Sequence, residues 1–174
     1  MVPELREIAS GLRFPEGPIA MADGSVILVE IERGTLTRIG PDGAVSYVAR
    51  PGGGPNGAAI GPDGRCYICN NGGFKWTPEG DESGLRPIGQ AEDYSGGRIE
   101  AIDLTTGAVE VLYRETDKGP LKGPNDLVMD GEGGFYFTDL GKVRAREQDR
   151  GAVYYARADG SHIREVVFPL FTPN

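Results

Sequence analysis

Histidine and cysteine are scarce in this chain, with one histidine and two cysteines among 174 residues. His162 follows a turn and has no Ser- or Cys-centred nucleophile motif to accompany it, which disfavours a hydrolytic triad. Cys66 and Cys69 form a C-x-x-C pair without a second pair. In a strand-like setting they should point to opposite faces of a sheet, which argues against both a zinc site and a thioredoxin-like motif.

Long apolar segments are also missing. No stretch approaches the roughly 20 residues that a transmembrane helix needs. The start of the chain, Met1–Glu7, is polar and does not have the apolar core of a secretory signal. Together with the low cysteine content, these features lead us to expect a cytoplasmic protein.

Positive charge is in deficit, since 18 Lys and Arg face 26 Asp and Glu and the formal net charge is −8. An acidic surface repels phosphate groups, so we expect neither nucleic acid nor an anionic membrane as a partner. The charge is compatible with a bound divalent cation, and solubility alone would also explain it. The length fits one domain with a sizeable core.

Glycine and proline are abundant, with 28 and 13 residues, and they separate short apolar or alternating runs about every ten residues. This spacing is typical of an all-β fold, and no amphipathic helix longer than two turns is evident. The first unit contains runs at Val26–Glu30, Thr35–Ile39 and Val45–Ala49, and the next unit opens at Ala58–Ile60. Further strands are expected at residues 97–103, 107–113 and 151–156.

A short phrase recurs along the chain. It reads Gly-Pro-Asn-Gly at residues 54–57 and Gly-Pro-Asn-Asp at 123–126, with weaker copies at 15–18 and 172–174. Repetition on this scale indicates a repeat architecture. A radial array would bring together the side-chain oxygens that share one position in the four copies: Glu16, Asn56, Asn125 and Asn174.

The intervals between these four positions are 40, 69 and 49 residues, and a propeller blade takes roughly 40–50. The long middle interval contains residues 70–97, which are polar and glycine-rich and show no strand alternation. We therefore expect one partial propeller domain over residues 1–174, with a loop inserted at about 70–97. Such a loop is either a functional lid or disordered, and its Phe74, Trp76 and Tyr94 either line a substrate mouth or pack the loop down.

The ordered phrases resemble the SMP-30/gluconolactonase/luciferin-regenerating (regucalcin-like) family over the whole chain. They are Pro15-Glu16-Gly17-Pro18, Pro124-Asn125-Asp126-Leu127-Val128 with Tyr136-Phe137-Thr138-Asp139, and Pro173-Asn174. The resemblance implies an all-β, six-bladed β-propeller, of which this chain holds the N-terminal half, about three to four blades. It also implies one divalent metal in the central tunnel, calcium or zinc, and hydrolysis of a small-molecule lactone.

The same resemblance assigns metal ligands. Glu16, Asn125 and Asn174 stand at the family's ligand positions, and Asn125 is a metal or substrate contact. Asn56, in a near-copy of the phrase, is a second candidate for substrate binding. Calcium is favoured among the metals, because a hard cation takes carboxylate and amide oxygens. Without such a role, Glu16 would be an ordinary turn residue and Asn125 an Asx-turn former.

The general base is less well defined. The family's usual Asp lies in a later blade, so Asp139 and Asp126 are the only nearby carboxylates that could substitute, and both could be purely structural. Gly123 stands where the family often has a substrate-holding Arg. In the expected chemistry, the metal polarises the lactone carbonyl and a carboxylate activates the attacking water.

Two other functions compete with the lactonase interpretation. A truncated propeller exposes unpaired strand edges, which would suit a non-catalytic binding or assembly module, including self-association that closes the ring. A propeller of the strictosidine-synthase type shares the architecture without metal-dependent hydrolysis, and architecture alone does not fix function.

Overall fold

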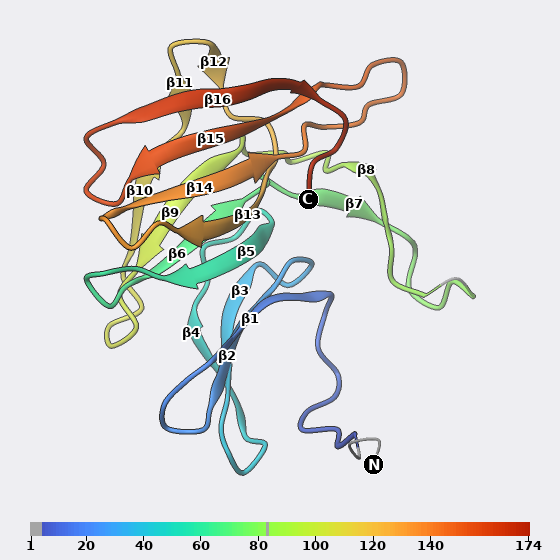
Figure 1. Cartoon of the computed structure of the whole chain (residues 1–174). Helices are drawn as coiled ribbons and strands as arrows, with labels where there is room; N and C mark the ends of the chain where they lie inside the picture. Colours follow the sequence, from blue (N-terminus) through green and yellow to red (C-terminus); the bar gives the residue numbers. More distant parts are fainter. Residues whose placement is uncertain (1–4, 83) are drawn as a thin grey trace.

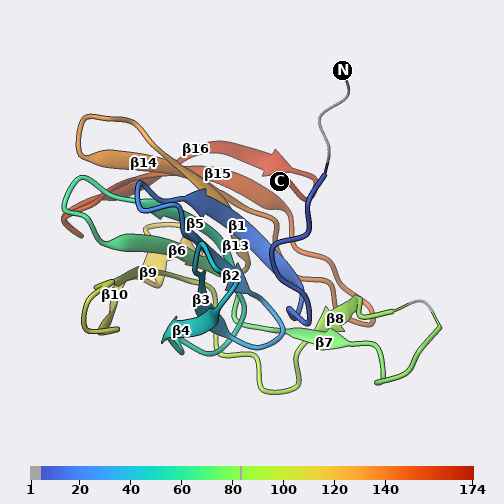
Figure 2. The ribbon, with the colours of Figure 1, turned by 90° about the horizontal axis from the view of Figure 1, so that it is seen from below.

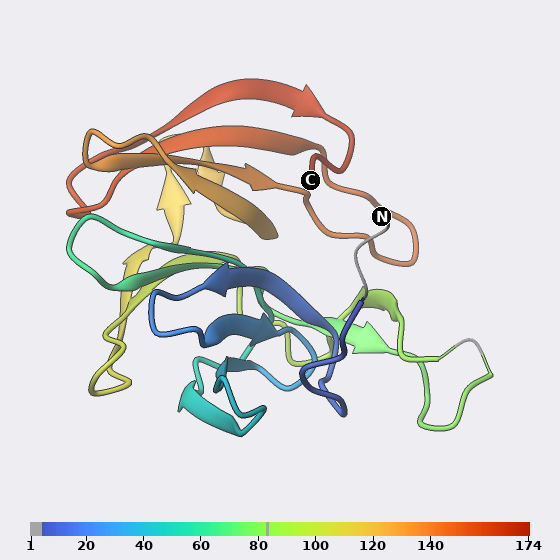
Figure 3. The ribbon, with the colours of Figure 1, turned by 60° about the horizontal axis from the view of Figure 1, so that its bottom comes forward.

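The computed structural model describes residues 5–82 and 84–174, and strands are the regular structure of that part of the chain. Three four-stranded antiparallel sheets, which we call blades 1, 2 and 3, follow one another along the chain and are stacked in that order (Figures 1 and 3). None of the described residues forms a helix that is long and apolar enough to cross a membrane. The prediction of a partial all-β propeller with about three to four blades is confirmed, with three blades present.

Each blade is a meander, apart from the insertion in blade 2. Blade 1 contains β1 (Pro15–Ala20), β2 (Val26–Glu30), β3 (Thr35–Ile39) and β4 (Val45–Ala49). Blade 2 contains β5 (Pro55–Ile60), β6 (Cys66–Asn70), β9 (Arg98–Ile102) and β10 (Val109–Tyr113). Blade 3 contains β13 (Pro124–Met129), β14 (Gly134–Asp139), β15 (Gly151–Arg157) and β16 (Ile163–Leu170). Two small hairpins are added: β7 (Phe74–Trp76) with β8 (Pro87–Gln90), and β11 (Glu115–Thr116) with β12 (Gly119–Pro120).

The recurring phrase is itself the first strand of each blade. The bounds expected for Val26–Glu30, Thr35–Ile39 and Val45–Ala49 agree with β2, β3 and β4. The expectation that the first unit begins at Val26 is wrong, because β1 precedes it and carries Pro15 and Glu16. Proline and glycine hid this strand in the sequence, since both are normally depleted from strand interiors. The first strands lie side by side, with β5 between β1 and β13.

The core consists of the apolar layers between blades. Ile27, Val29 and Leu36 of blade 1 pack against Cys66 and Ile68 of blade 2. On the opposite face of β6, Tyr67 and Cys69 pack toward blade 3 with Phe135 and Phe137. Because neighbouring side chains alternate along a strand, one strand serves both layers.

The two cysteines therefore point to opposite faces of β6, as predicted, and both are buried and free. Burial raises the pKa of the Cys66 thiol to about 12 and that of Cys69 well above its ordinary value. Buried thiols with raised pKa values are poor nucleophiles and poor metal ligands. This environment is that of structural cysteines.

The insertion between β6 and β9 is more ordered than expected. It was predicted to contain no strand, and that prediction is wrong, because β7 and β8 pair as an antiparallel hairpin that projects beyond the blades (Figure 2). The hairpin strands are only three and four residues long, and a glycine and a proline lie within β8. Such short interrupted strands leave no alternation for sequence analysis to detect.

Close approach of the first strands depends on glycine at one position in the phrase. A Cβ on Gly57 would collide with the Asp126 carboxylate and lie 2.6 Å from the Asn125 carbonyl oxygen, both on β13. Likewise, a Cβ on Gly17 would lie 2.7 Å from the Ala58 backbone nitrogen of β5. Any larger residue would push neighbouring blades apart at the inner edge.

We predict that Gly57→Ala lowers the free energy of unfolding by about 1–3 kcal/mol, the usual cost of overpacking a close contact. Gly64→Ala is the control, because a Cβ there meets nothing within 4 Å. The substitution adds only the backbone strain of a positive φ angle of 79°. Urea denaturation followed by circular dichroism measures both variants. A Gly57→Ala variant as stable as wild type would show that the inner edge has room to spare.

Candidate functional site

Each first strand carries a β-bulge at the same place. The register shifts between Glu16 and Ile19 in blade 1, between Pro55 and Ala58 in blade 2, and between Pro124 and Leu127 in blade 3. A bulge re-aims the side chains around it, and bulges often lie beside functional sites. The recurring Glu or Asn lies at or inside this irregularity in all three blades.

The bulged strands bring the predicted residues to one cavity of about 180 Å³. Glu16, Asn56, Asn125, Asn174 and Asp126 all line it, although they come from three blades and from the end of the chain. The expectation that a radial arrangement gathers these side chains is therefore confirmed in the geometry. Their roles as ligands or substrate contacts stay predictions.

The three asparagines form a continuous row of amides. Asn56 Nδ2 donates a hydrogen bond to Asn125 Oδ1 at 2.6 Å, and Asn125 Nδ2 donates to Asn174 Oδ1 at 2.5 Å. Asn56 and Asn125 are 7% and 6% exposed, so water competes little for the bond between them, whereas Asn174 is exposed. Glu16 differs, because its side chain is exposed and has no hydrogen-bond or ion-pair partner among the described residues.

Asp139 lies outside this cavity and is occupied by the backbone. Its Oδ1 accepts hydrogen bonds from the N–H groups of Gly123 (2.7 Å) and Gly141 (2.8 Å), and its Oδ2 accepts one from Lys122 (2.8 Å). Burial raises the pKa of the Asp139 carboxyl, an effect that these donors oppose. The structure thus brings only one of the two candidate bases, Asp126, to the cavity.

The same arrangement recurs in the other blades, which explains the role of Asp139 in the fold. Glu30 and Asn70 occupy the equivalent position at the end of the second strand, opposite the first proline of the phrase. Glu30 accepts the Arg13 N–H at 2.7 Å, and Asn70 accepts the Gly54 N–H at 2.9 Å. We call this residue the clamp, since in each blade it holds the loop that enters the first strand.

Sequence analysis missed one aromatic ring, that of Phe14, and one lysine, whereas Phe74 was among the residues expected either to line a substrate mouth or to pack the loop down. Phe14 and Phe74 line the cavity, and their rings lie 5.0 and 6.0 Å from that of Trp76. The aromatic residues of the insertion were the only signal for this wall. Lys142 is 1% exposed and reaches the insertion from blade 3, but nothing in its sequence context distinguishes it from a surface lysine.

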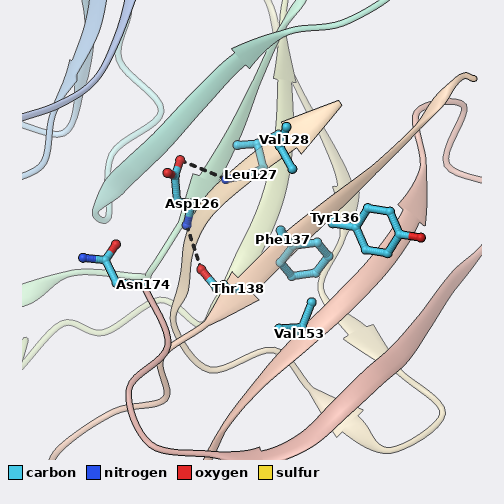
Figure 4. A pocket seen from close by; sticks show the side chains of 8 residues that line it. All are labelled: Asp126, Leu127, Val128, Tyr136, Phe137, Thr138, Val153 and Asn174. Carbon is cyan, nitrogen blue, oxygen red and sulfur yellow. Dashed lines mark hydrogen bonds between the residues drawn. The ribbon is translucent and has the colours of Figure 1, made fainter. Parts of the chain in front are cut away.

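A second hollow lies on the outer face of blade 3 (Figure 4). It shares Asp126 and Asn174 with the first cavity, but its other walls are mostly apolar, including Val128, Tyr136 and Val153. Val128 and Tyr136 are 63% and 40% exposed. In blades 1 and 2 the corresponding face packs against the next blade along the chain.

The donors around the first cavity suit a particular type of cation. No group of three or more His, Cys, Asp or Glu that could hold a metal is present in the described ranges. The cavity instead offers the carboxylates of Glu16 and Asp126 and the amides of three asparagines. An all-oxygen set fits a hard cation such as Ca²⁺ and does not provide the nitrogen and sulfur ligands that zinc usually takes.

Comparison with known proteins accounts for this arrangement. Residues 14–174 match the model of the SMP-30/Gluconolactonase/LRE-like region. The chain belongs to this family. The region includes all three blades and every candidate residue named above, which confirms the resemblance inferred from the ordered phrases.

Individual relatives are distant and longer. A gluconolactonase from Zymomonas mobilis subsp. mobilis is 25% identical in an alignment that covers 88% of this chain and 42% of that protein. A solved gluconolactonase from Xanthomonas campestris has a TM-score of 0.68 at 21% identity, covering 94% of this chain and 50% of its own. Virginiamycin B lyase from Staphylococcus aureus has a TM-score of 0.59 at 17% identity, over 92% and 43% of the two chains. The chain thus spans half or less of the length of these relatives.

We predict that Asp139→Asn lowers the free energy of unfolding by about 1–3 kcal/mol, because an amide keeps one acceptor oxygen and leaves a buried N–H unpaired. Asp126→Asn, which is isosteric in the same way, should change it by less than about 0.5 kcal/mol at an exposed position. Urea denaturation of both variants tests the difference. Equal effects would contradict the assignment of Asp139 as a clamp.

The buried lysine also predicts a pH dependence. Burial lowers the pKa of Lys142 to about 7, and the Asp139 carboxylate opposes the shift. Between that value and about 10.4 the unfolded chain binds one proton more than the folded chain, so stability rises with pH by up to about 1.4 kcal/mol per unit. The full gain in the free energy of unfolding is therefore present above the unfolded-state pKa of Lys142, and it is lost as the pH falls through the folded-state pKa of about 7.

Lys142→Met should remove this rise. The measurement is the free energy of unfolding of wild type and variant at several pH values from 7 to 10, plotted as a difference. The raised pKa of Cys66 acts in the opposite direction, but it is present in both proteins and cancels. A difference that does not change with pH would contradict the prediction.

Proposed function

We propose that this chain contributes the Glu16, Asn56, Asn125 and Asn174 side of a calcium-dependent site that hydrolyses a sugar lactone. The observation that carries the proposal is the convergence of these four side chains, from three blades and the chain end, on one cavity. Membership of the family, and the gluconolactonases among its similar proteins, supply the reaction class.

Glu16, Asn125 and Asn174 are the residues that would hold the cation. Glu16 provides a carboxylate without a competing partner among the described residues, and the amides provide neutral oxygens. When bound, calcium would supply Lewis-acid polarisation of the lactone carbonyl. With neutral amides as most of its ligands, the site would leave positive charge available for that purpose.

The remaining cavity residues suit the substrate, and Asn125 could contact both the cation and the substrate. The Asn56 and Asn125 amides present hydrogen-bond donors and acceptors that can orient ring hydroxyl groups. Phe14 and Phe74 provide an apolar wall for the C–H face of the ring. The Asp126 carboxylate is exposed at the cavity and can take a proton from a water molecule, the role of a general base.

A second candidate function is supported by the hollow on blade 3. Its exposed Val128 and Tyr136 form the kind of apolar surface that, in this chain, otherwise packs between blades. A binding or assembly module would use that surface and would not need calcium. Calcium binding and lactone hydrolysis therefore separate the two functions.

The test is a calcium titration by calorimetry on the chain, with Glu16→Gln as the probe variant and Glu132→Gln as the matched control. Glu132 is exposed in a turn of blade 3, away from the cavity. We expect saturable binding that Glu16→Gln weakens at least about tenfold, since it removes a ligand charge, and that Glu132→Gln preserves. We also expect hydrolysis of gluconolactone that stops after chelation.

Two results would overturn the proposal. The first is the absence of calcium binding, and the second is binding that is equally strong in wild type and Glu16→Gln. Hydrolysis that survives exhaustive chelation would reject the metal requirement while leaving the reaction class in place.

A further inference from the structure

Lys142 is buried, yet it contributes nothing to the carboxylate and amide row of the candidate site. It lies in the connection between β14 and β15 of blade 3 and is 1% exposed. Its Nζ donates hydrogen bonds to Asn71 Oδ1 at 3.2 Å and to the Gly73 carbonyl at 2.9 Å. The same nitrogen lies 4.1 Å from the ring centroid of Phe74 and 5.2 Å from that of Tyr94.

All four contacts are therefore made with the insertion of blade 2. A lysine is almost never fully buried unless it is paired with a charge, and Lys142 forms no salt bridge within the described residues. Two carbonyl acceptors and two aromatic rings offset part of its desolvation, and the Asp139 carboxylate also favours the charged amine. Two acceptors require only two N–H donors, so the hydrogen bonds persist whether the amine is charged or neutral.

The segment that Lys142 contacts is also held from within blade 2, because the Asn71 N–H donates to the Gly54 carbonyl at 2.8 Å and the Gly72 N–H donates to Asn70 Oδ1 at 3.0 Å. Gly72 and Gly73 both have positive φ angles, 79° and 112°, which only glycine adopts without strain. The Asn71 Oδ1 accepts the Gly73 N–H at 2.9 Å, and the Asn71 Nδ2 is buried with no hydrogen-bond partner among residues 5–82 and 84–174. Phe74 follows directly, at the start of β7, and lines the cavity.

The hydrogen bonds from Lys142 therefore connect blade 3 to the Asn71–Gly73 turn, which directly precedes the Phe74 ring at the cavity. A further hydrogen bond connects the β7–β8 hairpin to the same part of blade 3, since the Gln90 N–H donates to the Val143 carbonyl at 3.3 Å. On the other side, Trp76 packs on Phe14, which precedes β1. The insertion therefore contacts blade 3 through Val143 and the segment that precedes blade 1 through Phe14.

We propose that Lys142 is a positioning residue that fixes Phe74 as the aromatic wall of the cavity. The use of this wall for a lactone ring rests on the proposed function, whereas the positioning itself does not. Lys142 acts through the Asn71–Gly73 turn and the Phe74 ring and would not touch the reacting atoms.

The fluorescence of Trp76 can be used to test this proposal. Trp76 is its single tryptophan, and its ring lies 6.0 Å from Phe74 and 5.0 Å from Phe14. Its emission and its quenching by acrylamide therefore report the packing of the insertion. Neither measurement needs calcium or a lactone.

Lys142→Met should shift the Trp76 emission to longer wavelength and raise its quenching constant at least about twofold, because a thioether donates no hydrogen bond to the turn. Phe74→Ala should give the same signature through loss of the ring itself. Lys75→Met is the matched control, since Lys75 lies on β7 but is exposed and pairs with Glu92 at 3.1 Å. The control should leave both readings at wild-type values.

Circular dichroism checks that each variant keeps its strands, and Lys142→Gln, which retains a side-chain N–H donor, should give a smaller change than Lys142→Met. Unchanged Trp76 emission and quenching in folded Lys142→Met would overturn the proposal. So would unfolding of both Lys142 variants, since Lys142 would then support the whole fold instead of positioning one ring.

The two proposals can fail separately. Fluorescence changes without calcium binding would keep Lys142 as a positioning residue and reject the calcium site. Calcium binding with unchanged fluorescence would keep the calcium site and reject Lys142 as a positioning residue.

Discussion

The hydrogen bonds of the clamp residues are the interaction on which the site depends. Each first strand begins at a proline, which has no N–H to offer the sheet. The clamp opposite that proline compensates, because its side chain captures the N–H groups of the loop just before the strand. The residue after each proline is the one that faces the cavity. The clamp therefore fixes the position of Glu16, Asn56 and Asn125 by holding the backbone immediately ahead of them.

The clamps also explain why the blades can place polar groups so close to their apolar layers. Glu30, Asn70 and Asp139 are buried, but each has several hydrogen-bond partners and so avoids most of the cost of burial. Asn70, for instance, donates to Glu100, which in turn pairs with Arg98. This polar shell separates the hydrophobic layers from the amide row. The cavity residues can then be polar without opening the core to water.

How much of this the sequence reveals depends on whether a feature repeats. The shared position of Glu16, Asn56, Asn125 and Asn174 was predictable, because one local phrase builds one local structure in every blade. The clamp was not recognised, because it is Glu in one blade, Asn in the next and Asp in the third, and the same chemistry is carried by different residue types. Asp139 was consequently interpreted as a candidate base, although its oxygens are held by backbone N–H groups.

Features that arise from contacts between distant segments were beyond sequence analysis. Lys142 and Asn71 are 71 positions apart, and neither has a local pattern that connects them. The β7–β8 hairpin is similarly too short to show a period, and packing on Phe14 and blade 3 compensates for its weak strand propensity. Tertiary contacts of this kind override local preference.

The composition of the row sets what it can bind. Ca²⁺ takes six to eight oxygen ligands, and its affinity rises with the number of charged ligands and with the rigidity of the site. In the proposed calcium site, Glu16 would supply a charged ligand, while the asparagines would supply neutral oxygens that already accept hydrogen bonds within the row. In the proposed site, a cation would compete with those amide hydrogen bonds for the same oxygens, which would lower its net affinity, and the neutral ligands would leave more of its charge unneutralised. If the proposed site polarises a lactone carbonyl, that residual charge would contribute more to catalysis than tight binding of the cation.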